Sequence, residues 1–224
     1  MRWVPERSIN LTFHGIGEPG RQLDPGERDV WVSREQFRSV LDCVVGRPDV
    51  MITFDDGNAS DLRIALPALR DRRLTATFFV IAGRLGKPRF LDEAGVRALA
   101  AAGMEIGCHG MHHRRWRRLD QSALREELVE AKAILEQTAE QPVTLAACPF
   151  GSYDRNVLRA LSRYGYRHVF TSDGGRARPG DFLQARNSVR PEHGSGLLEQ
   201  LSGRDAGLPS GVRRRVKMAV KQWR

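Results

Sequence analysis

Two adjacent aspartates, Asp55 and Asp56, end the apolar run VMITF and are followed at once by a glycine. Two carboxylates in contact repel each other, so one of them tends to hold its proton unless a cation lies close by. A divalent metal ion removes that conflict, because one carboxylate can bind the ion while the other stays free to accept a proton from water. The simpler interpretation is a turn, which Asp-Asp-Gly also favours.

Histidines with the spacing of metal ligands follow in the sequence HGMHH. His109 and His113 are four residues apart and can reach one ion from a single turn of chain, whereas His112 is a rival ligand at spacing three. One aspartate with two histidines leaves coordination positions open for water and substrate, which is typical of a catalytic metal site. Zinc is the expected ion, and nickel, cobalt or iron(II) would fit the same ligands. A solvated basic loop is the alternative interpretation.

The elements that must position these residues alternate between strand and helix. Apolar, β-branched and aromatic runs predict strands, and apolar residues three or four apart predict helices whose N-caps include Ser33, Asp92 and Asp154. The predicted strands cover residues 9–16, 50–54, 74–82, 104–108, 143–148, 166–172 and 182–189. The predicted helices cover residues 34–42, 61–72, 93–103, 121–140 and 155–165, the second with a kink or a restart at Pro67.

Such alternation is typical of an α/β fold in which helices cover a parallel sheet, either open or closed into a barrel. Ligands of these folds bind at the carboxyl ends of the strands. Several polar residues stand where predicted strands end, namely His14, Asp55, Asp56, His109 and Asp173. We therefore expect carboxylates and imidazoles from separate strands to converge on one rim.

Three motifs in this order resemble those of a known family. TFDDG, HGMHH and CPFGSYD are similar to the motifs of the polysaccharide deacetylases with the NodB homology fold, carbohydrate esterase family 4, and the resemblance covers about residues 11–173. It implies a distorted (β/α)7 barrel. It also implies that Asp55 is the general base and that Asp56, His109 and His113 bind the metal.

The chain departs from the family pattern in two motifs. Gly110 stands where the family has a serine or threonine that braces the histidine loop. In the third motif many relatives read Arg-Pro-Pro-Tyr-Gly, and the arginine orients the catalytic aspartate, whereas here Cys148 precedes the proline. A branch that acts on exopolysaccharides has a similar Tyr-Pro-Tyr/Phe-Gly form. The resemblance implies that the N–H of Phe150 donates to the oxyanion, and it leaves the residue that orients Asp55 unassigned.

The general acid of the family follows a Leu-x-Leu-x-His motif on a C-terminal strand. The C-terminal candidate here is SVRPEHGSG, in which His193 does not follow a clean apolar alternation. The N-terminal stretch NLTFHG resembles the branch in which that strand has moved to the front of the chain. The resemblance therefore implies His14 as the general acid, with His193 as the runner-up and a hydrogen-bonded strand-end histidine as the alternative.

The implied reaction is metal-assisted hydrolysis of an N-acetyl group on an amino sugar, in a poly- or oligosaccharide or a glycan precursor. Trp116, Tyr153 and Asp173 are the expected substrate contacts, with Trp116 stacked on a sugar ring at the rim. Two alternatives stay open. One is another C–N amide hydrolase or an O-deacetylase with the same site, and the other is a catalytically decayed basic binding module, which the basic tail Val212–Arg224 favours.

Charge and composition limit the partners and the compartment. The net charge of +9, from 36 basic and 27 acidic residues among 224, indicates an anionic partner or a solvated basic surface. No motif favours nucleic acid, and the tail suggests only weak contact with a membrane surface. We expect a barrel over residues 1–193 and a basic helical extension over 194–224 packed on it. Without an apolar signal segment, we expect a cytoplasmic protein.

Overall fold

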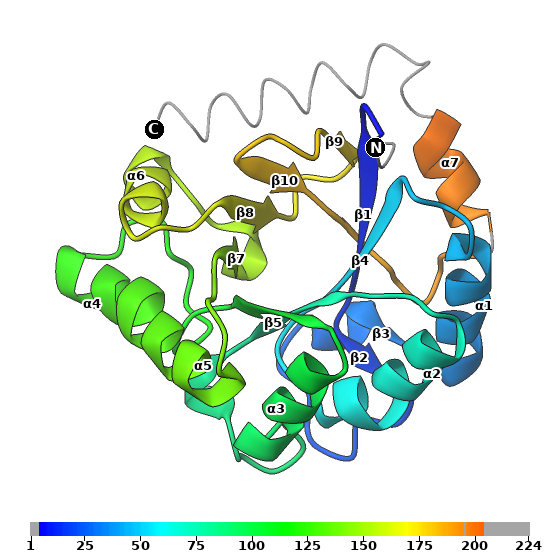
Figure 1. Ribbon diagram of the computed structural model, residues 1–224, viewed down its shortest axis with the longest axis horizontal. Coiled ribbons are helices and arrows are strands. Elements are labelled where there is room, and N and C mark those ends of the chain that lie inside the picture. The colour runs from blue at the N-terminus through cyan, green and yellow to red at the C-terminus, as the bar shows by residue number, and fades with distance from the viewer. Residues whose placement is uncertain (1–4, 195, 204–224) are drawn as a thin grey trace.

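The structure, a computed structural model, describes residues 5–194 and 196–203 (Figure 1). Its centre is a curved sheet with the strand order β10-β8-β7-β6-β5-β4-β1-β11, in which all these neighbours are parallel. These strands are β1 (Ser8–Phe13), β4 (Val50–Phe54), β5 (Thr77–Val80), β6 (Glu105–Cys108), β7 (Leu145–Ala147), β8 (His168–Thr171), β10 (Leu183–Ala185) and β11 (Asn187–Ser188).

Two consecutive strands close this sheet into a barrel. β10 pairs with β8 on one side, and β11 pairs with β1 on the other. Only Arg186 separates β10 from β11, so the two form one interrupted strand that joins both edges of the sheet. With β1 and β4 to β8 they complete a ring of seven. The (β/α)7 barrel that the family resemblance implies is therefore confirmed.

Helices cover the outside of the barrel (Figure 1). The predicted N-caps are confirmed, since the side chains of Ser33, Asp92 and Asp154 each accept a hydrogen bond from a backbone N–H of the first helical turn. The helices are α1 (Arg34–Val44), α2 (Leu66–Asp71), α3 (Glu93–Ala101), α4 (Gln121–Arg125), α5 (Ala131–Ala139), α6 (Arg155–Arg163) and α7 (Leu197–Gly203). A π-helical turn, Asp61–Ala65, precedes α2, and another, Glu126–Glu130, joins α4 to α5.

Shorter elements complete the rim and the base. β2 (Gly15–Ile16) and β3 (Trp31–Val32) form a small parallel sheet, and β9 (Arg176–Ala177) pairs antiparallel with β1. The 3-10 turns are Glu27–Val30, Ala82–Arg84 and Pro149–Gly151. The last of these follows β7 after one residue, Cys148, and places the third sequence motif next to the carboxyl ends of the strands.

Alternation along the strands separates the apolar core from a polar barrel interior. On β4, Phe54 packs outward against Phe37 of α1, with ring centroids 6.0 Å apart. Thr53 faces the other way, and its hydroxyl lies 3.0 Å from the hydroxyl of Thr12 on β1. Residues two apart on a strand share a face, so the same alternation aims Asp55 toward the interior at the end of β4.

The C-terminal part of the described chain packs on the barrel. Leu197, Leu198 and Leu201 of α7 are buried and belong to the main core cluster. Residues 204–224, which make up most of the predicted basic extension, lie outside the described residues, so the domain boundary at residue 193 stays a prediction. Within the described ranges no helix combines the length and apolar character needed to cross a membrane.

Candidate active site

A cavity of about 530 Å³ opens at the carboxyl ends of the strands. Among the residues that line it are His14 after β1, Asp55 and Asp56 after β4, and His109 and His113 after β6. The structure thus brings together on one rim five side chains that the strand ends and the motifs predict, whereas Asp173, also predicted at a strand end, does not line the cavity.

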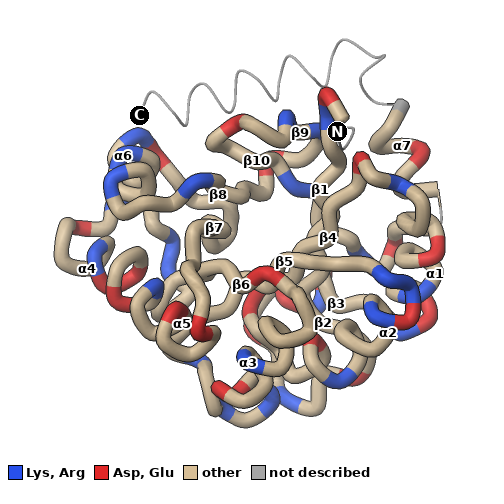
Figure 2. The backbone as a smooth tube through the Cα atoms, viewed as in Figure 1, with Lys and Arg blue, Asp and Glu red and all other residues tan. Residues whose placement is uncertain are grey.

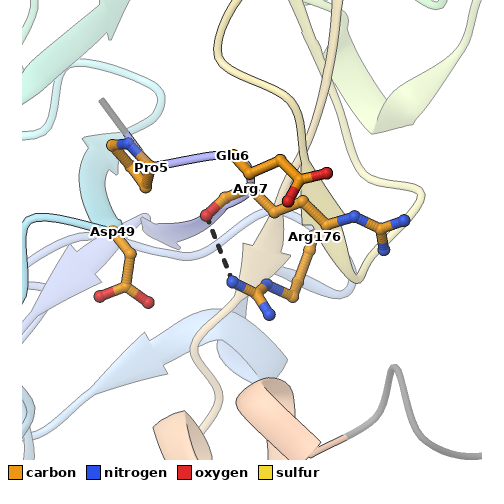
Figure 3. A pocket seen from close by; sticks show the side chains of 5 residues that line it. All are labelled: Pro5, Glu6, Arg7, Asp49 and Arg176. Atoms are coloured by element: carbon orange, nitrogen blue, oxygen red, sulfur yellow. Dashed lines mark hydrogen bonds between the residues drawn. The ribbon is translucent and has the colours of Figure 1, made fainter. Parts of the chain in front are cut away.

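A smaller pocket of about 290 Å³ lies at the opposite end of the barrel, where β1 and β4 begin (Figure 3). Pro5, Glu6, Arg7, Asp49 and Arg176 line it, and Arg176 donates a hydrogen bond of 3.2 Å to the carbonyl of Arg7. None of the predicted site residues lies there. We therefore place the chemistry at the carboxyl ends.

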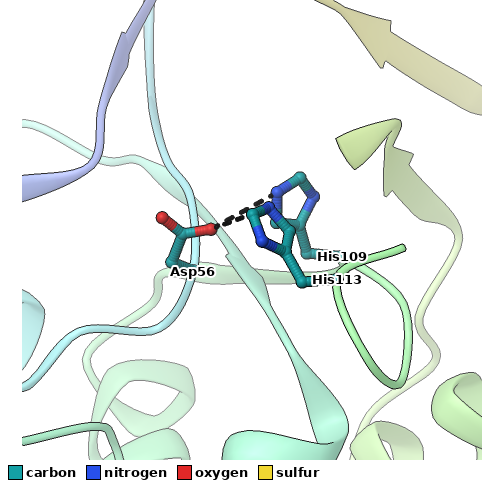
Figure 4. Close-up of side chains that lie close together, drawn as sticks. All are labelled: Asp56, His109 and His113. Atoms are coloured by element: carbon teal, nitrogen blue, oxygen red, sulfur yellow. Dashed lines mark ion pairs between the residues drawn. The ribbon is translucent and has the colours of Figure 1, made fainter. Parts of the chain in front are cut away.

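Three side chains in the cavity form a candidate metal group: Asp56, His109 and His113 (Figure 4). Their ligand atoms all lie within 4.8 Å of one another. The Nε2 atoms of His109 and His113 lie 3.6 Å and 3.4 Å from Oδ1 of Asp56. That oxygen is buried and has no hydrogen-bond partner among the described residues. An unpartnered carboxylate oxygen that faces two imidazoles is a donor set for a divalent cation, so these residues fit a metal ion.

Burial keeps both imidazoles neutral, as metal ligands must be. It lowers the pKa of His109 to about 3 and that of His113 to about 4, so neither ring holds a second proton near neutral pH. Nδ1 of His109 lies 2.9 Å from the carbonyl oxygen of Ala147, which fixes the proton on Nδ1 and leaves the lone pair on Nε2. The rival ligand His112 is exposed and pairs instead with Glu126, at 2.8 Å.

Arg186 holds Asp55 in place. Its two Nη atoms donate to the two carboxylate oxygens at 2.6 Å and 2.8 Å, and both side chains are buried. Burial alone would raise the pKa of Asp55, but the charge and hydrogen bonds of Arg186, together with the nearby imidazoles of His109 and His14, outweigh burial and hold that pKa well below its usual range. The pKa of Asp56 moves the other way, to about 6, through burial and the negative charge of Asp55. The neighbouring carboxylates therefore fit different roles.

Arg186 takes the place that the sequence analysis left unassigned. It lies between β10 and β11, where its Nη1 also lies 3.3 Å from the hydroxyl of Thr53. Arginine therefore orients Asp55 from the closing strand rather than from the motif that contains Cys148. The one signal in the sequence is a single charged residue inside the predicted strand 182–189.

The histidine loop is braced by a buried carboxylate that the sequence analysis did not single out. Glu127 accepts hydrogen bonds from the N–H groups of Met111 and His112, at 2.9 Å and 3.1 Å, and from the indole N–H of Trp116, at 3.3 Å. Trp116 is completely buried and does not line the cavity. The structure therefore contradicts the expectation that Trp116 stacks on a sugar ring. Its indole N–H finds a buried acceptor, and its ring fills the core.

This brace explains why glycine stands at position 110. Gly110 has a φ of +82°, and a Cβ atom there would lie 2.2 Å from Oε2 of Glu127. The serine or threonine of the family pattern has no room here, because the carboxylate of Glu127 occupies the space and itself bonds the loop.

Alanine at position 110 is expected to lower the free energy of unfolding by about 2–4 kcal/mol, because the new methyl group would press on a carboxylate that three donors hold. Gly103→Ala is the matched control. Gly103 has a φ of +80° and open space around it, so its variant reports backbone strain alone, about 1 kcal/mol. Urea denaturation measures both variants, and equal losses would contradict the steric role of Glu127.

His14 lies beside the oriented aspartate. Its Nε2 is 3.8 Å from Oδ2 of Asp55, and the residue lines the cavity. His193 accepts a hydrogen bond from the N–H of Arg190 at 3.1 Å and is not among the residues that line the cavity. The geometry favours His14 over His193 as a proton donor in this site.

The third motif places only one of its predicted residues at the cavity. Phe150 lies in the 3-10 turn with a φ of +56°, is 53% exposed and has its ring centroid 4.5 Å from that of His113. Tyr153 is buried and donates a hydrogen bond of 2.8 Å from its hydroxyl to Asp173, and neither residue lines the cavity. The structure therefore contradicts the expectation that Tyr153 and Asp173 contact the substrate. They join the loops that follow β7 and β8.

Comparison with known sequences agrees with this geometry. Residues 44–169 match the family model for polysaccharide deacetylase. YxkH of Bacillus subtilis (strain 168), named as a candidate polysaccharide deacetylase, is 28% identical over 192 residues, which cover 85% of this chain and 66% of that protein. A peptidoglycan-N-acetylglucosamine deacetylase of Bacillus cereus is 29% identical over 124 residues, 55% of this chain and 56% of that protein. The chain thus spans about two thirds or less of the length of these relatives.

Solved structures share the fold. The deacetylase PplD of Streptococcus pyogenes, solved in complex with acetate, has a TM-score of 0.75 at 21% identity, over 88% of this chain and 99% of that chain. IcaB from Ammonifex degensii has a TM-score of 0.70 at 23% identity, over 91% of this chain and 97% of that chain. These similarities show the same barrel. Because the family match covers more than half of the residues, the chain belongs to the polysaccharide deacetylase family.

Proposed function

We propose that the protein is a metal-dependent hydrolase that removes the N-acetyl group from an amino sugar in a poly- or oligosaccharide or a glycan precursor. One observation carries the proposal, namely the different partners of two neighbouring carboxylates. Arg186 keeps Asp55 ionised, whereas an oxygen of Asp56 faces His109 and His113 without a hydrogen-bond partner among the described residues. Membership of the family supports the same class of reaction.

Asp56, His109 and His113 would hold the divalent cation, and zinc is the ion we expect for two imidazoles and a carboxylate. In that position the cation would supply Lewis acidity, which polarises a carbonyl group and makes a coordinated water more acidic. Asp55 stays outside this group because both of its oxygens are bonded to Arg186.

The chain's own residues account for the proton transfers. Asp55 accepts the proton of the attacking water, a role that suits a carboxylate which is ionised and fixed by two hydrogen bonds. The backbone N–H of Phe150 donates to the oxyanion that forms at the acetyl carbonyl. His14 donates a proton to the nitrogen of the leaving amine, so the products are acetate and a free amino sugar.

Acetate release from matched substrates tests the proposal. The purified protein is incubated with N-acetylglucosamine oligomers and with O-acetylated xylose oligomers, and acetate and free amine are measured. We expect acetate and amine in equal amounts from the N-acetyl substrate. Release from the O-acetyl substrate alone would replace the proposal with an O-deacetylase. Release from neither substrate by a protein without metal would favour the decayed binding module.

Metal content tests the ligand set directly. The purified protein is expected to hold about one equivalent of a divalent metal, and alanine at His113 should lower the metal affinity by at least about 10-fold, the smallest loss typical even of an outer-shell partner. His112→Ala is the matched control, because this neighbouring histidine is exposed and bonded to Glu126. Elemental analysis after dialysis gives the metal content. Equal content in the wild type and both variants would contradict the assignment of His113.

A further inference from the structure

Three arginines that the proposed reaction does not use line the cavity, and one of them, Arg84, pairs with the carboxylate of Asp24. The other two are Arg115 and Arg190. Arg115 lies in the loop after β6, and Arg190 follows β11. Both are exposed, and within the described ranges neither lies in ion-pair contact with a carboxylate. We infer that the cavity takes an acidic glycan, in which a carboxylate or phosphate group lies close to the N-acetylated sugar. This inference rests on the proposed function and names the substrate class of that site.

Three of the four carboxylates that line the cavity already pair with other arginines. The pairs are Asp24 with Arg84 at 2.9 Å, Glu27 with Arg21 at 2.9 Å and Asp55 with Arg186 at 2.6 Å, while Asp56 faces the two histidines of the metal group. The charges of Arg115 and Arg190 are therefore not neutralised inside the protein. With the charge of Asp56 offset by the proposed divalent cation, the remaining charge of the cavity is positive, and such a cavity concentrates anionic ligands.

Arg115 is held in a defined orientation beside the reaction centre. Its guanidinium carbon lies 4.5 Å from the ring centroid of Phe150, and that ring lies 4.5 Å from the ring of His113. A guanidinium stacked on an aromatic ring keeps the N–H groups at its edge free to bind a carboxylate or phosphate in its own plane. Because only one aromatic ring separates Arg115 from His113, an anion bound there belongs to the reacting sugar or to its neighbour.

Arg190 approaches the cavity from another part of the rim. In the ring of strands, β11 and β6 are separated by β8 and β7 on one side and by β1, β4 and β5 on the other. The backbone of Arg190 is fixed, since its N–H donates to His193 at 3.1 Å and its carbonyl accepts from Gln36 at 2.6 Å. Positive charge on two sides of the rim suits an extended chain with several negative charges better than one small anion.

Exposed arginines elsewhere on the surface supply a control. Figure 2 shows basic residues in blue along α6. The arginines of this helix, Arg155, Arg159 and Arg163, are all exposed, and none of them lines the cavity. The number of arginines therefore does not distinguish the cavity from α6. What distinguishes it is the position of Arg115 and Arg190 around the metal group.

The test compares one anionic oligosaccharide with its own neutral form. Heparosan tetrasaccharide alternates N-acetylglucosamine with glucuronate, and reduction of its carboxylates to alcohols removes the charge with little change of shape. Both forms are titrated by calorimetry into Asp55→Asn, a background that slows turnover strongly and is common to every arm. We expect the anionic form to bind at least about 10-fold more tightly at low salt, with a preference that falls as salt rises.

Variants in the same background assign the preference to residues. Arg115→Gln and Arg190→Gln should each reduce the preference for the anionic form, whereas Arg159→Gln should leave that preference unchanged. N-acetylglucosamine 1-phosphate, compared with N-acetylglucosamine, separates the two sources of charge: a preference for the phosphate form supports the inference through phosphate, and a preference for heparosan supports it through carboxylate.

Other outcomes would overturn the inference. Equal binding in both comparisons, including no measurable binding of any form, contradicts it, and so does an equal loss in Arg159→Gln and Arg115→Gln. Acetate release by the wild type from the reduced tetrasaccharide is measured separately. If acetate is released and the anionic and reduced tetrasaccharides bind equally, the acidic glycan is rejected as the substrate class and the proposed deacetylation still stands.

Discussion

Asparagine at position 55 is expected to lower the kcat of acetate release by about 10²- to 10⁴-fold, the contribution typical of a positioned general base. An amide has nearly the shape of the carboxylate but cannot accept the proton of the attacking water. Metal binding should survive, because the candidate ligands are Asp56, His109 and His113. Initial rates with N-acetylglucosamine oligomers, together with elemental analysis of the same samples, measure both quantities.

Asp173→Asn is the control for this substitution. Asp173 accepts a hydrogen bond from Tyr153 and does not line the cavity, and an amide oxygen can accept the same bond. Its variant should keep rates close to those of the wild type. If Asp55→Asn retained such rates as well, another group would have to be the base. If Asp55→Asn lost its metal, Asp55 would be a ligand and the two carboxylates would not have separate roles.

Much of the site follows from local sequence patterns. The period of two along the first two predicted strands sends Thr12 and Thr53 inward, and the same period carries His14 and Asp55 to the rim. The spacing of four brings His113 rather than His112 to the metal group. These predictions work because strand alternation and short loops act over only a few residues, which one sequence displays.

The residues that sequence reasoning missed act over long distances in the chain. Arg186 contacts Asp55 only because β11 pairs with β1 and closes the barrel. No local sequence pattern specifies this long-range pairing. In the sequence, Glu127 is one of several acidic residues on a predicted helix. In the structure it lies in a π-helical turn that buries it against the loop of residues 109–113. The prediction that Trp116 lies at the rim is wrong for the same reason, since the acceptor of its indole N–H is the buried carboxylate of Glu127.

Methionine at position 186 is expected to lower the free energy of unfolding by about 3–5 kcal/mol, because the buried carboxylate of Asp55 would lose its only cationic partner at hydrogen-bond distance among the described residues. Activity should fall with it, since the base is no longer oriented. The double variant Asp55→Asn/Arg186→Met should lose less than the sum of the two single variants, because it leaves no unpaired charge. Urea denaturation of the wild type, the two single variants and the double variant gives the free energies of this double-mutant cycle.

The pH dependence of these stabilities separates charge from packing. Because the pKa of Asp55 is lower in the folded than in the unfolded chain, the ion pair stabilises fully above the unfolded value of about 3.9 and less as the pH falls toward the folded value. Without Arg186, burial raises the folded pKa of Asp55 above its ordinary value, so the stability difference between the wild type and Arg186→Met should begin to narrow above a pH of about 4 and should shrink further as the pH falls. The guanidinium also lies 5.1 Å and 5.9 Å from the rings of Phe79 and Phe170. A difference that does not change with pH would mean that Arg186 supports the barrel through these rings, and not through the charge of Asp55.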